Sequence, residues 1–286
     1  MRSFSVVVRT AIAVVALLVL AALGAVQLAS SAAYGDLAAR PSLPAALHAA
    51  DPSLLRPLLG GPLARAAAAV HDGDLDEAAA LLAPLPRDAS TADLRGRIAE
   101  ARGDNAAAVR AYIDAGDVER AQGLIGALAQ TNLLGALDDE QRLVNNLRGA
   151  DAVEVRGQAL WRLGQLQATA GYVDPPKRRT WWLRAQRTYE QTLALAPNEE
   201  TYLLAAGYQA LANGDVAGAL RHYTRAAAVV PNSGDAYAGL AWAYAARGDC
   251  ASARRALARA RRLSISVQRD PTADPNLGAP LKRCGV

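Results

Sequence analysis

The sequence is poor in the residues that most often carry chemistry. Its 286 residues include two cysteines, three histidines, one methionine and one phenylalanine, and aromatic residues make up 5% of the chain. Two cysteines without nearby histidines lack the ligands that a zinc site needs. No serine or cysteine nucleophile can be paired with a base and an orienting acid, and no glycine-rich phosphate loop is present. We therefore expect no enzyme, no cofactor and no metal site.

Lysine is also scarce, and the basic charge is unevenly spread. Of 31 basic residues only Lys177 and Lys282 are lysines, a bias typical of a GC-rich bacterial genome. Residues 31–150 carry 11 arginines against 16 acids, a net charge of −5. Residues 151–286 carry 18 basic residues against 11 acids, a net charge of +7. The C-terminal half is therefore the basic one.

The densest basic cluster lies near the C-terminus and includes Arg254, Arg255 and Arg259. It fits a surface for an acidic protein, an anionic polymer or lipid headgroups. It equally fits a solvated outer face that keeps the last element of a helical array soluble. No aromatic residues alternate with these arginines, which argues against nucleic acid as a partner.

One long apolar run stands at the N-terminus. Residues 11–26, AIAVVALLVLAALGAV, contain no polar side chain. With its flanks the run reaches about 20 residues, enough to cross ~30 Å of hydrocarbon as a helix. Arg2 and Arg9 precede it and no charge follows before Asp36. This asymmetry predicts a cytoplasmic N-terminus and an exported remainder.

We therefore expect an N-terminal transmembrane signal-anchor over residues 1–32 and a linker over 33–54, at the bacterial cytoplasmic membrane. A cleaved signal peptide and a secreted product are the alternative, because residues 30–33, SSAA, form a small-residue cleavage site. A third interpretation is that the apolar run forms a buried core helix. No lipobox cysteine stands near the run, so lipid anchoring has no residue to use.

Two copies of a 34-residue pattern stand head to tail at residues 200–233 and 234–267. A fixed period of this length indicates stacked supersecondary units. Gly214 and Gly248 are each followed by Asp, and each dipeptide separates two helix-favouring segments. Gly accepts a positive φ at the end of the first helix, and Asp can cap the second. Small and large residues recur in register, namely Gly207 and Ala241, Ala219 and Ala253, Tyr223 and Leu257, and Ala226 and Ala260.

This pattern resembles the tetratricopeptide repeat. The resemblance rests on Gly207, Ala219, Tyr223, Ala226 and the helix-ending Pro231 in the first copy, and on Leu240, Ala253 and Ala260 in the second. Ala241 stands where the family usually has Gly, and neither copy has the family's Trp near its start. The resemblance implies an all-α, right-handed helical-hairpin solenoid, here preceded by one transmembrane helix. It also implies a concave surface that binds a protein or peptide.

Earlier segments carry the pattern with more changes. An interrupted repeat has Gly164 in its first helix and Ala185 and Tyr189 in its second, and we expect a loop at the inserted residues 171–179 between them. Gly-Asp dipeptides at 73, 103 and 116 indicate eroded repeats further back, with Gly96 and Tyr112 in register. We expect degenerate repeats over 55–150, tetratricopeptide-like repeats over 151–267 and an irregular tail over 268–286.

The candidate binding residues follow from this arrangement. Tyr208, Gln209 and Asn213 lie on a first helix and are expected to face the inner groove. The aromatic residues between 161 and 244, Trp161 and Tyr202 among them, mostly occupy positions that pack between helices. Adjacent Trp181 and Trp182 cannot both face one side of a helix, so one of them is a candidate anchor for a partner.

Cys250 follows the last Gly-Asp turn, and Cys284 lies in the tail. In an oxidising compartment a disulfide between them would hold the tail against the final repeat. Two independent thiols are the alternative.

Three functions remain from different classes. The leading one is a membrane-anchored, extracytoplasmic scaffold for protein–protein interactions in envelope assembly, secretion or surface-polysaccharide machinery. The second is an accessory subunit that binds a carbohydrate or anionic polymer through its arginine-rich end. The third, a hydrolase or transferase on a helical scaffold, would need paired carboxylates or a nucleophile with its base.

Overall fold

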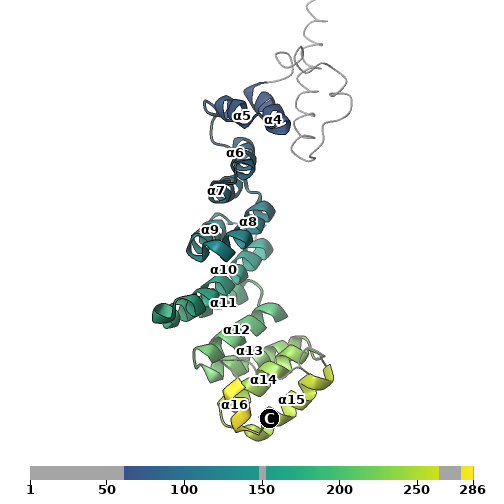
Figure 1. Ribbon diagram of the computed structural model, residues 1–286. Helices are drawn as coiled ribbons and strands as arrows, with labels where there is room; N and C mark the ends of the chain where they lie inside the picture. The colour runs from purple at the N-terminus through teal and green to yellow at the C-terminus, as the bar shows by residue number, and fades with distance from the viewer. Residues whose placement is uncertain (1–60, 148–152, 264–277, 286) are drawn as a thin grey trace, which may run out of the picture. The chain divides into compact units, whose positions relative to one another are not determined.

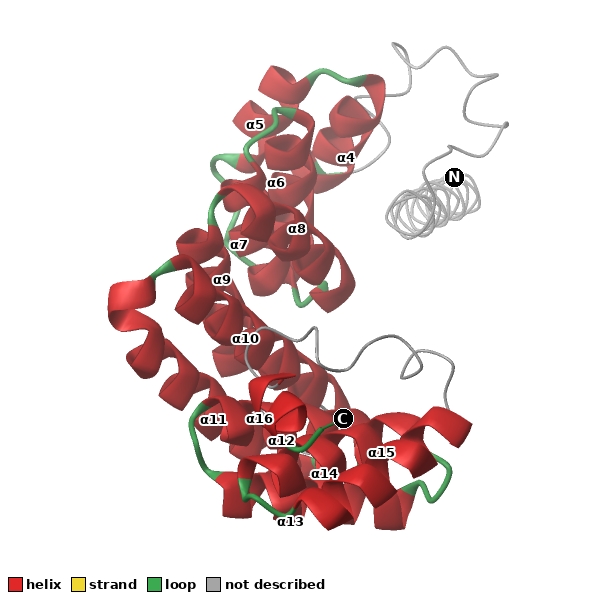
Figure 2. Cartoon of the chain, turned by 60° about the horizontal axis from the view of Figure 1, so that its bottom comes forward, coloured by secondary structure: helices red, strands yellow, loops and turns green. Residues whose placement is uncertain are grey.

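The computed structural model describes residues 61–147, 153–263 and 278–285. Within these ranges the chain forms thirteen α-helices and one 3-10 helix, and it contains no strand (Figure 2). The expected transmembrane segment over 1–32 and the linker lie outside the described residues. No helix in the described part of the chain is both long and apolar enough to span a membrane.

The chain divides into two compact units, residues 1–124 and 125–286. In the first unit, α4 (Pro62–Asp72) packs against α5 (Leu75–Leu82), and α6 (Ala89–Ala101) packs against α7 (Asn105–Ala115). α8 (Val118–Thr131) begins in this unit and ends in the second. Small side chains bring the helices of the first pair close together. The core beneath them includes Ala66, Ala69, Ala78, Leu82, Leu94 and Ile98.

The second unit continues the same architecture. Its helices are α9 (Leu133–Asn146), α10 (Val153–Val173), α11 (Arg178–Leu195), α12 (Glu200–Ala212), α13 (Val216–Val229), α14 (Gly234–Ala246), α15 (Cys250–Leu263) and α16 (Gly278–Arg283). Hairpins form from α10 and α11, α12 and α13, and α14 and α15, and each hairpin packs on the next (Figure 1). The predicted all-α solenoid of the tetratricopeptide type is confirmed for these helices.

The Gly-Asp dipeptides form the helix-to-helix turns as predicted. The five glycines, Gly73, Gly103, Gly116, Gly214 and Gly248, have φ between 76° and 86°. Such a left-handed backbone favours glycine because it has no Cβ. The following aspartates accept a hydrogen bond from the backbone N–H three residues further on and so cap the next helix. These capping residues are Asp74, Asp104, Asp117, Asp215 and Asp249.

A glycine and a tyrosine are in close contact inside three of the hairpins. A Cβ placed on Gly96 would lie 2.6 Å from Tyr112, and one on Gly164 would lie 2.5 Å from Tyr189. The same contact joins Gly207 to Tyr223. The remaining predicted packing residues are also buried, apart from Pro231, which follows the end of α13. They are Ala185, Ala219, Ala226, Leu240, Ala241, Ala253 and Ala260.

The expected loop at residues 171–179 is wrong, because the inserted residues lengthen the hairpin. α10 runs on to Val173, a 3-10 turn, η2 (Pro175–Lys177), follows, and α11 begins at Arg178. Two contacts hold the extension. The Trp182 ring lies against Gly171, and Arg178 Nε donates a hydrogen bond to the Gly171 carbonyl at 3.1 Å.

The tail also departs from expectation, because residues 278–283 form α16 instead of irregular chain. α16 packs against α14 (Figure 1). Leu281 is fully buried and joins the core of the last hairpin, so burial of an apolar face stabilises a helix too short to persist alone.

Candidate functional site

The three expected groove residues do not line one open surface. Gln209 is 2% exposed, and Asn213 is half-buried with its Nδ2 donating to Gln186 Oε1 at 2.6 Å. Tyr208 is also half-buried, and its hydroxyl lies 3.3 Å from that of Tyr172. Gln209 is therefore not open to a partner, because α12 is covered by α11, α13 and α14 together, whereas the groove assignment of Tyr208 and Asn213 stays a prediction.

Of the tryptophan pair, Trp182 is structural. It is 9% exposed, and its Nε1 donates to the Ala168 carbonyl across the hairpin at 3.2 Å. Trp181 is half-buried, and the guanidinium carbon of Arg184 lies 5.0 Å from its ring centroid. Trp182 therefore packs inside the hairpin, whereas Trp181 keeps part of its surface exposed and stays the candidate anchor.

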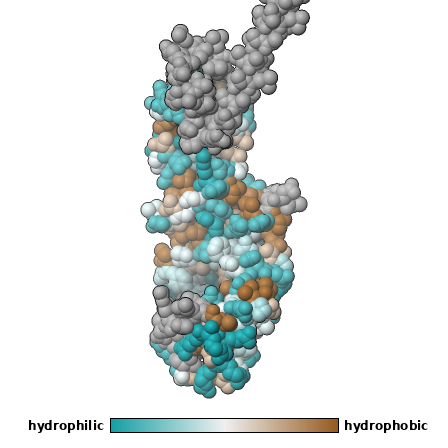
Figure 3. Space-filling model, turned by 90° about the vertical axis from the view of Figure 1, so that its right-hand side faces the viewer, coloured by the Kyte–Doolittle hydropathy of each residue, from teal (hydrophilic) through white to brown (hydrophobic). Residues whose placement is uncertain are grey.

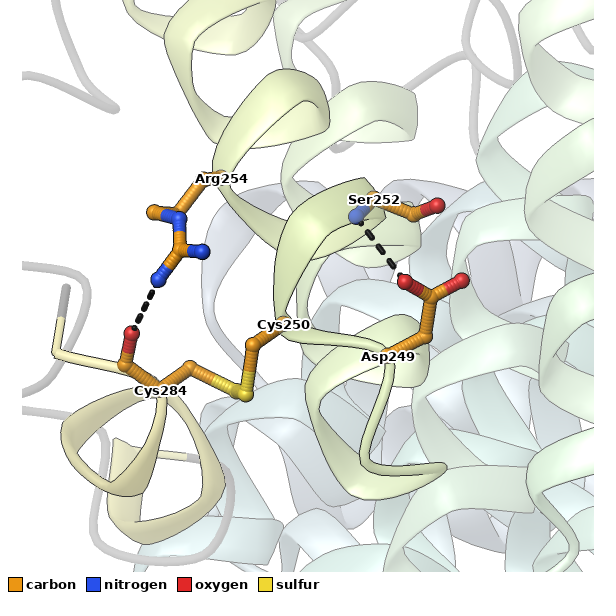
Figure 4. Close-up of a disulfide and its surroundings, with 5 residues drawn as sticks. All are labelled: Asp249, Cys250, Ser252, Arg254 and Cys284. Carbon is orange, nitrogen blue, oxygen red and sulfur yellow. Dashed lines mark hydrogen bonds between the residues drawn. A yellow bond between two sulfur atoms is a disulfide. The ribbon is translucent and has the colours of Figure 1, made fainter.

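The two cysteines are joined by a disulfide between α15 and the residue after α16 (Figure 4). Their Cα atoms are 5.0 Å apart. Arg254 reinforces the link by donating to the Cys284 carbonyl at 3.0 Å. The disulfide and this hydrogen bond hold α16 against the last hairpin.

The arginines of α15 are exposed but locally engaged. Arg259 donates to the Pro231 carbonyl at 3.4 Å, and its guanidinium carbon lies 4.2 Å from the centroid of the Tyr237 ring. Arg255 donates to Ser252 Oγ at 2.9 Å. Arg254, Arg255 and Arg259 all remain open to solvent, and the C-terminal end of the molecule is largely hydrophilic on the face shown in Figure 3. This end therefore presents positive charge and few apolar side chains on that face.

A separate cavity lies within the second unit, between the start of α10, the end of α11 and the start of α12. It has a volume of about 730 Å³ and opens to solvent. Trp161 and Tyr202 line it, with their ring centroids 6.4 Å apart and their planes tilted by 37°. Gly157 lies beside the Tyr202 ring, where a Cβ would meet the hydroxyl oxygen at 3.5 Å. We call this cavity the aromatic pocket.

Two carboxylates complete the aromatic pocket. Glu154 stands in the first turn of α10, and Glu199 is the residue before α12. Burial, followed by the negative charges of Glu199 and Glu154, raises the pKa of Tyr202. The negative field of both acids therefore reaches the tyrosine hydroxyl inside the pocket. The pocket combines two aromatic faces with negative charge, an arrangement suited to holding a ligand.

Sequence reasoning missed this site for identifiable reasons. Trp161 and Tyr202 occupy repeat positions that pack between helices, and they do pack there as well as lining the pocket. Glu154 and Glu199 stand at helix starts, where acidic residues are common for their effect on the helix dipole. No local pattern indicates that the four meet, because Glu154 and Trp161 belong to one hairpin and Glu199 and Tyr202 to the next.

One acid is buried away from the aromatic pocket. Glu140 on α9 is fully buried, and its Oε2 lies 3.8 Å from Arg162 Nε on α10. Burial raises the pKa of Glu140 to about 7, and the positive charge of Arg162 opposes this rise. Among the described residues, no cluster of three or more histidines, cysteines or acids could hold a metal ion.

Comparison with known proteins supports the repeat assignment for one part of the chain. The family model described as tetratricopeptide repeat matches residues 210–263, from the end of α12 through α15. A tetratricopeptide repeat is therefore present there. No curated protein matched the sequence.

Two solved structures are similar to the chain at low identity. Pseudomonas aeruginosa pilF is 14% identical with a TM-score of 0.41, and the match covers 76% of this chain and 96% of that one. The TPR2AB domain of yeast Sti1, solved in a complex with pHSP90, is 16% identical with a TM-score of 0.32. That match covers 79% of this chain and 97% of the Sti1 chain.

Proposed function

We propose that the protein is a scaffold that binds a protein or peptide segment, and that the segment is held in the aromatic pocket. The observation that carries the proposal is the open cavity of about 730 Å³ beside Trp161 and Tyr202 on stacked helical hairpins. Aromatic side chains beside a cavity offer large rigid contact surfaces, and such residues are enriched at binding hot spots. The tetratricopeptide repeat at residues 210–263 supports a role in protein binding.

We further propose that the scaffold is displayed outside the bacterial cytoplasmic membrane by a signal-anchor at residues 1–32. The apolar run at 11–26 with Arg2 and Arg9 before it supports this topology. The Cys250–Cys284 disulfide fits the same location, since such bonds persist mainly in oxidising compartments. A protein in this place would serve envelope assembly, secretion or surface-polysaccharide machinery.

Site-specific photocrosslinking in intact cells tests the proposed function. A photoreactive residue at Gln158, which lines the aromatic pocket, should crosslink to a discrete protein. The matched position is Thr224, exposed on α13 outside the pocket. The Gln158 crosslink should disappear in a Trp161→Ala background. Equal labelling from both positions, or labelling that survives Trp161→Ala, would contradict pocket binding.

Protease access tests the topology. A tag placed after Val286 should be cleaved in spheroplasts without detergent, and the protein should sediment with membranes. Protection of the tag until detergent is added would place the repeats in the cytosol and refute the display proposal.

A second candidate function uses the exposed arginines of α15. Arg254, Arg255 and Arg259 are open to solvent and present a positive surface to an anionic polymer or carbohydrate. Such binding should weaken steeply with salt, because exposed charges are screened over ~8 Å at physiological ionic strength. Heparin can serve as the test polyanion. An affinity for heparin at about 0.5 M salt that equals the affinity at low salt would exclude this mode.

A further inference from the structure

The charge of the aromatic pocket defines the chemistry of its ligand. We propose that the pocket receives a lysine or arginine side chain from an otherwise apolar segment of the partner protein. This inference rests on the proposed function, since it specifies which peptide the scaffold selects. The pocket would then prefer a positively charged group, whereas the basic surface of α15 would prefer a negatively charged one.

The first argument is the imbalance of charge. Glu154 and Glu199 line the aromatic pocket, and among the described residues that line it there is no lysine, arginine or histidine. Neither carboxylate forms an ion pair with any residue in the described parts of the chain. Elsewhere in this unit acids do find bases: Glu190 lies 3.1 Å from His222, and Asp249 lies 3.3 Å from Arg247. The pocket therefore leaves two carboxylates for a cation from outside.

The second argument concerns the ordinary explanation for these acids. Both stand at helix starts, where negative charge stabilises the helix. Glu199, however, makes no side-chain hydrogen bond to cap α12. Its carboxylate is therefore not used as a cap. Helix stabilisation also gives no reason for two acids of different helices to share one cavity with an aromatic pair.

The third argument is the shape and apolar character of the walls. A cation over an aromatic face is attracted by the ring's quadrupole, and the attraction grows as water is removed. Trp161 and Tyr202 line the pocket as such aromatic walls, and Gly157 lies in contact with the Tyr202 ring in the same lining. Lysine and arginine carry a long aliphatic stem that packs on apolar walls while the charged head reaches a polar group. A pocket with carboxylates and aromatic walls accommodates both parts.

Other ligand classes fit less well. A calcium ion needs six to eight oxygen ligands, roughly, whereas much of this lining is apolar or aromatic. An acidic peptide would be repelled by Glu154 and Glu199. A fully apolar peptide would leave both carboxylates without a counter-charge, so it gains less than a segment that brings one.

Selection from a random peptide library on the full-length protein tests the inference. Peptides that bind the wild type should share one lysine or arginine flanked by apolar residues. Their affinity should fall about tenfold for each of Glu154→Gln and Glu199→Gln, the expected loss for a charge-assisted hydrogen bond. The matched control is Asp235→Asn, which removes an acid from the first turn of α14 outside the pocket and should leave affinity unchanged. Thermal unfolding of each variant checks that it is folded.

The outcomes separate the two proposals. Peptides that need Trp161 but show no preference for lysine or arginine would overturn the cation inference and leave the scaffold function standing. Unchanged affinity in the Glu154→Gln, Glu199→Gln double variant would overturn it equally. If no selected peptide depends on Trp161, Glu154 or Glu199, both proposals fail together.

Discussion

The ring of Tyr223 lies between two glycines of successive hairpins. A Cβ on Gly207 would lie 2.8 Å from this ring, and one on Gly239 would overlap it. Gly207 belongs to α12 and Gly239 to α14, so one tyrosine on α13 closes its own hairpin and docks the next. The close approach of three helices therefore depends on residues without side chains.

Gly207→Ala should destabilise the second unit. The added methyl group meets a buried ring that cannot move away without disturbing α14, and overpacking of this kind costs about 1–3 kcal/mol. Urea unfolding measures the change. Gly126→Ala is the matched control, since its Cβ would meet only an Arg162 guanidinium nitrogen at 3.6 Å, an ordinary contact. Equal unfolding midpoints for the two variants would show that the ring contact does not limit packing.

The Gly214 turn should discriminate between substitutions by backbone conformation. Gly214 has a φ of 81°, and a Cβ placed on it would meet no other atom within 4 Å. Any loss of stability on substitution therefore comes from the backbone conformation and not from a clash. Gly214→Ala should lower the free energy of unfolding by about 1–2 kcal/mol. Gly214→Asn should lose less, because asparagine tolerates the left-handed region better. If alanine and asparagine cost the same, this explanation of the turn is wrong.

Glu140 should make stability depend on pH. Its pKa is about 7 in the folded protein and 4.5 when solvated, so the folded state keeps a proton that the unfolded state releases. The stability that Glu140 contributes is therefore fully present below about pH 4.5 and is lost as the pH rises to about 7. The loss is about 3 kcal/mol, at 1.36 kcal/mol per pKa unit. Glu140→Gln should flatten this slope between pH 5 and 7, roughly the window set by the two pKa values. Parallel profiles for the variant and the wild type would contradict a protonated native Glu140.

Reduction of the Cys250–Cys284 disulfide should free α16. The bond spans a sequence separation of 34 residues, and closing a loop of this size is worth about 3–4 kcal/mol in chain entropy. Dithiothreitol, or the double change Cys250→Ser and Cys284→Ser, should lower the unfolding midpoint of the second unit. Hydrogen exchange should show residues 278–285 exchanging faster. Unchanged exchange there would mean that buried Leu281 holds the helix without the bond.

Much of the fold could be predicted because its determinants are local. Gly214 followed by Asp215 specifies a turn through a positive φ and a cap, and Gly207 with Tyr223 specifies the spacing of one helix pair. The inserted segment at 171–179 was harder. Its extra length indicated a loop, whereas the packing of Trp182 on Gly171 continues the hairpin, and that contact joins the two helices of the hairpin.

The sequence by itself determined that this protein is a stack of helical hairpins, since turns, caps and glycine–tyrosine contacts recur within single repeats. Only the tertiary structure decided where a ligand can bind. Gln209 and Asn213 looked polar and available, yet neighbouring helices cover or engage them. Glu154 and Glu199 looked like ordinary helix starts, yet they face one aromatic pocket. The reason is physical: the chain sets which side of each helix is apolar, but the packing of three helices sets which polar groups keep access to solvent.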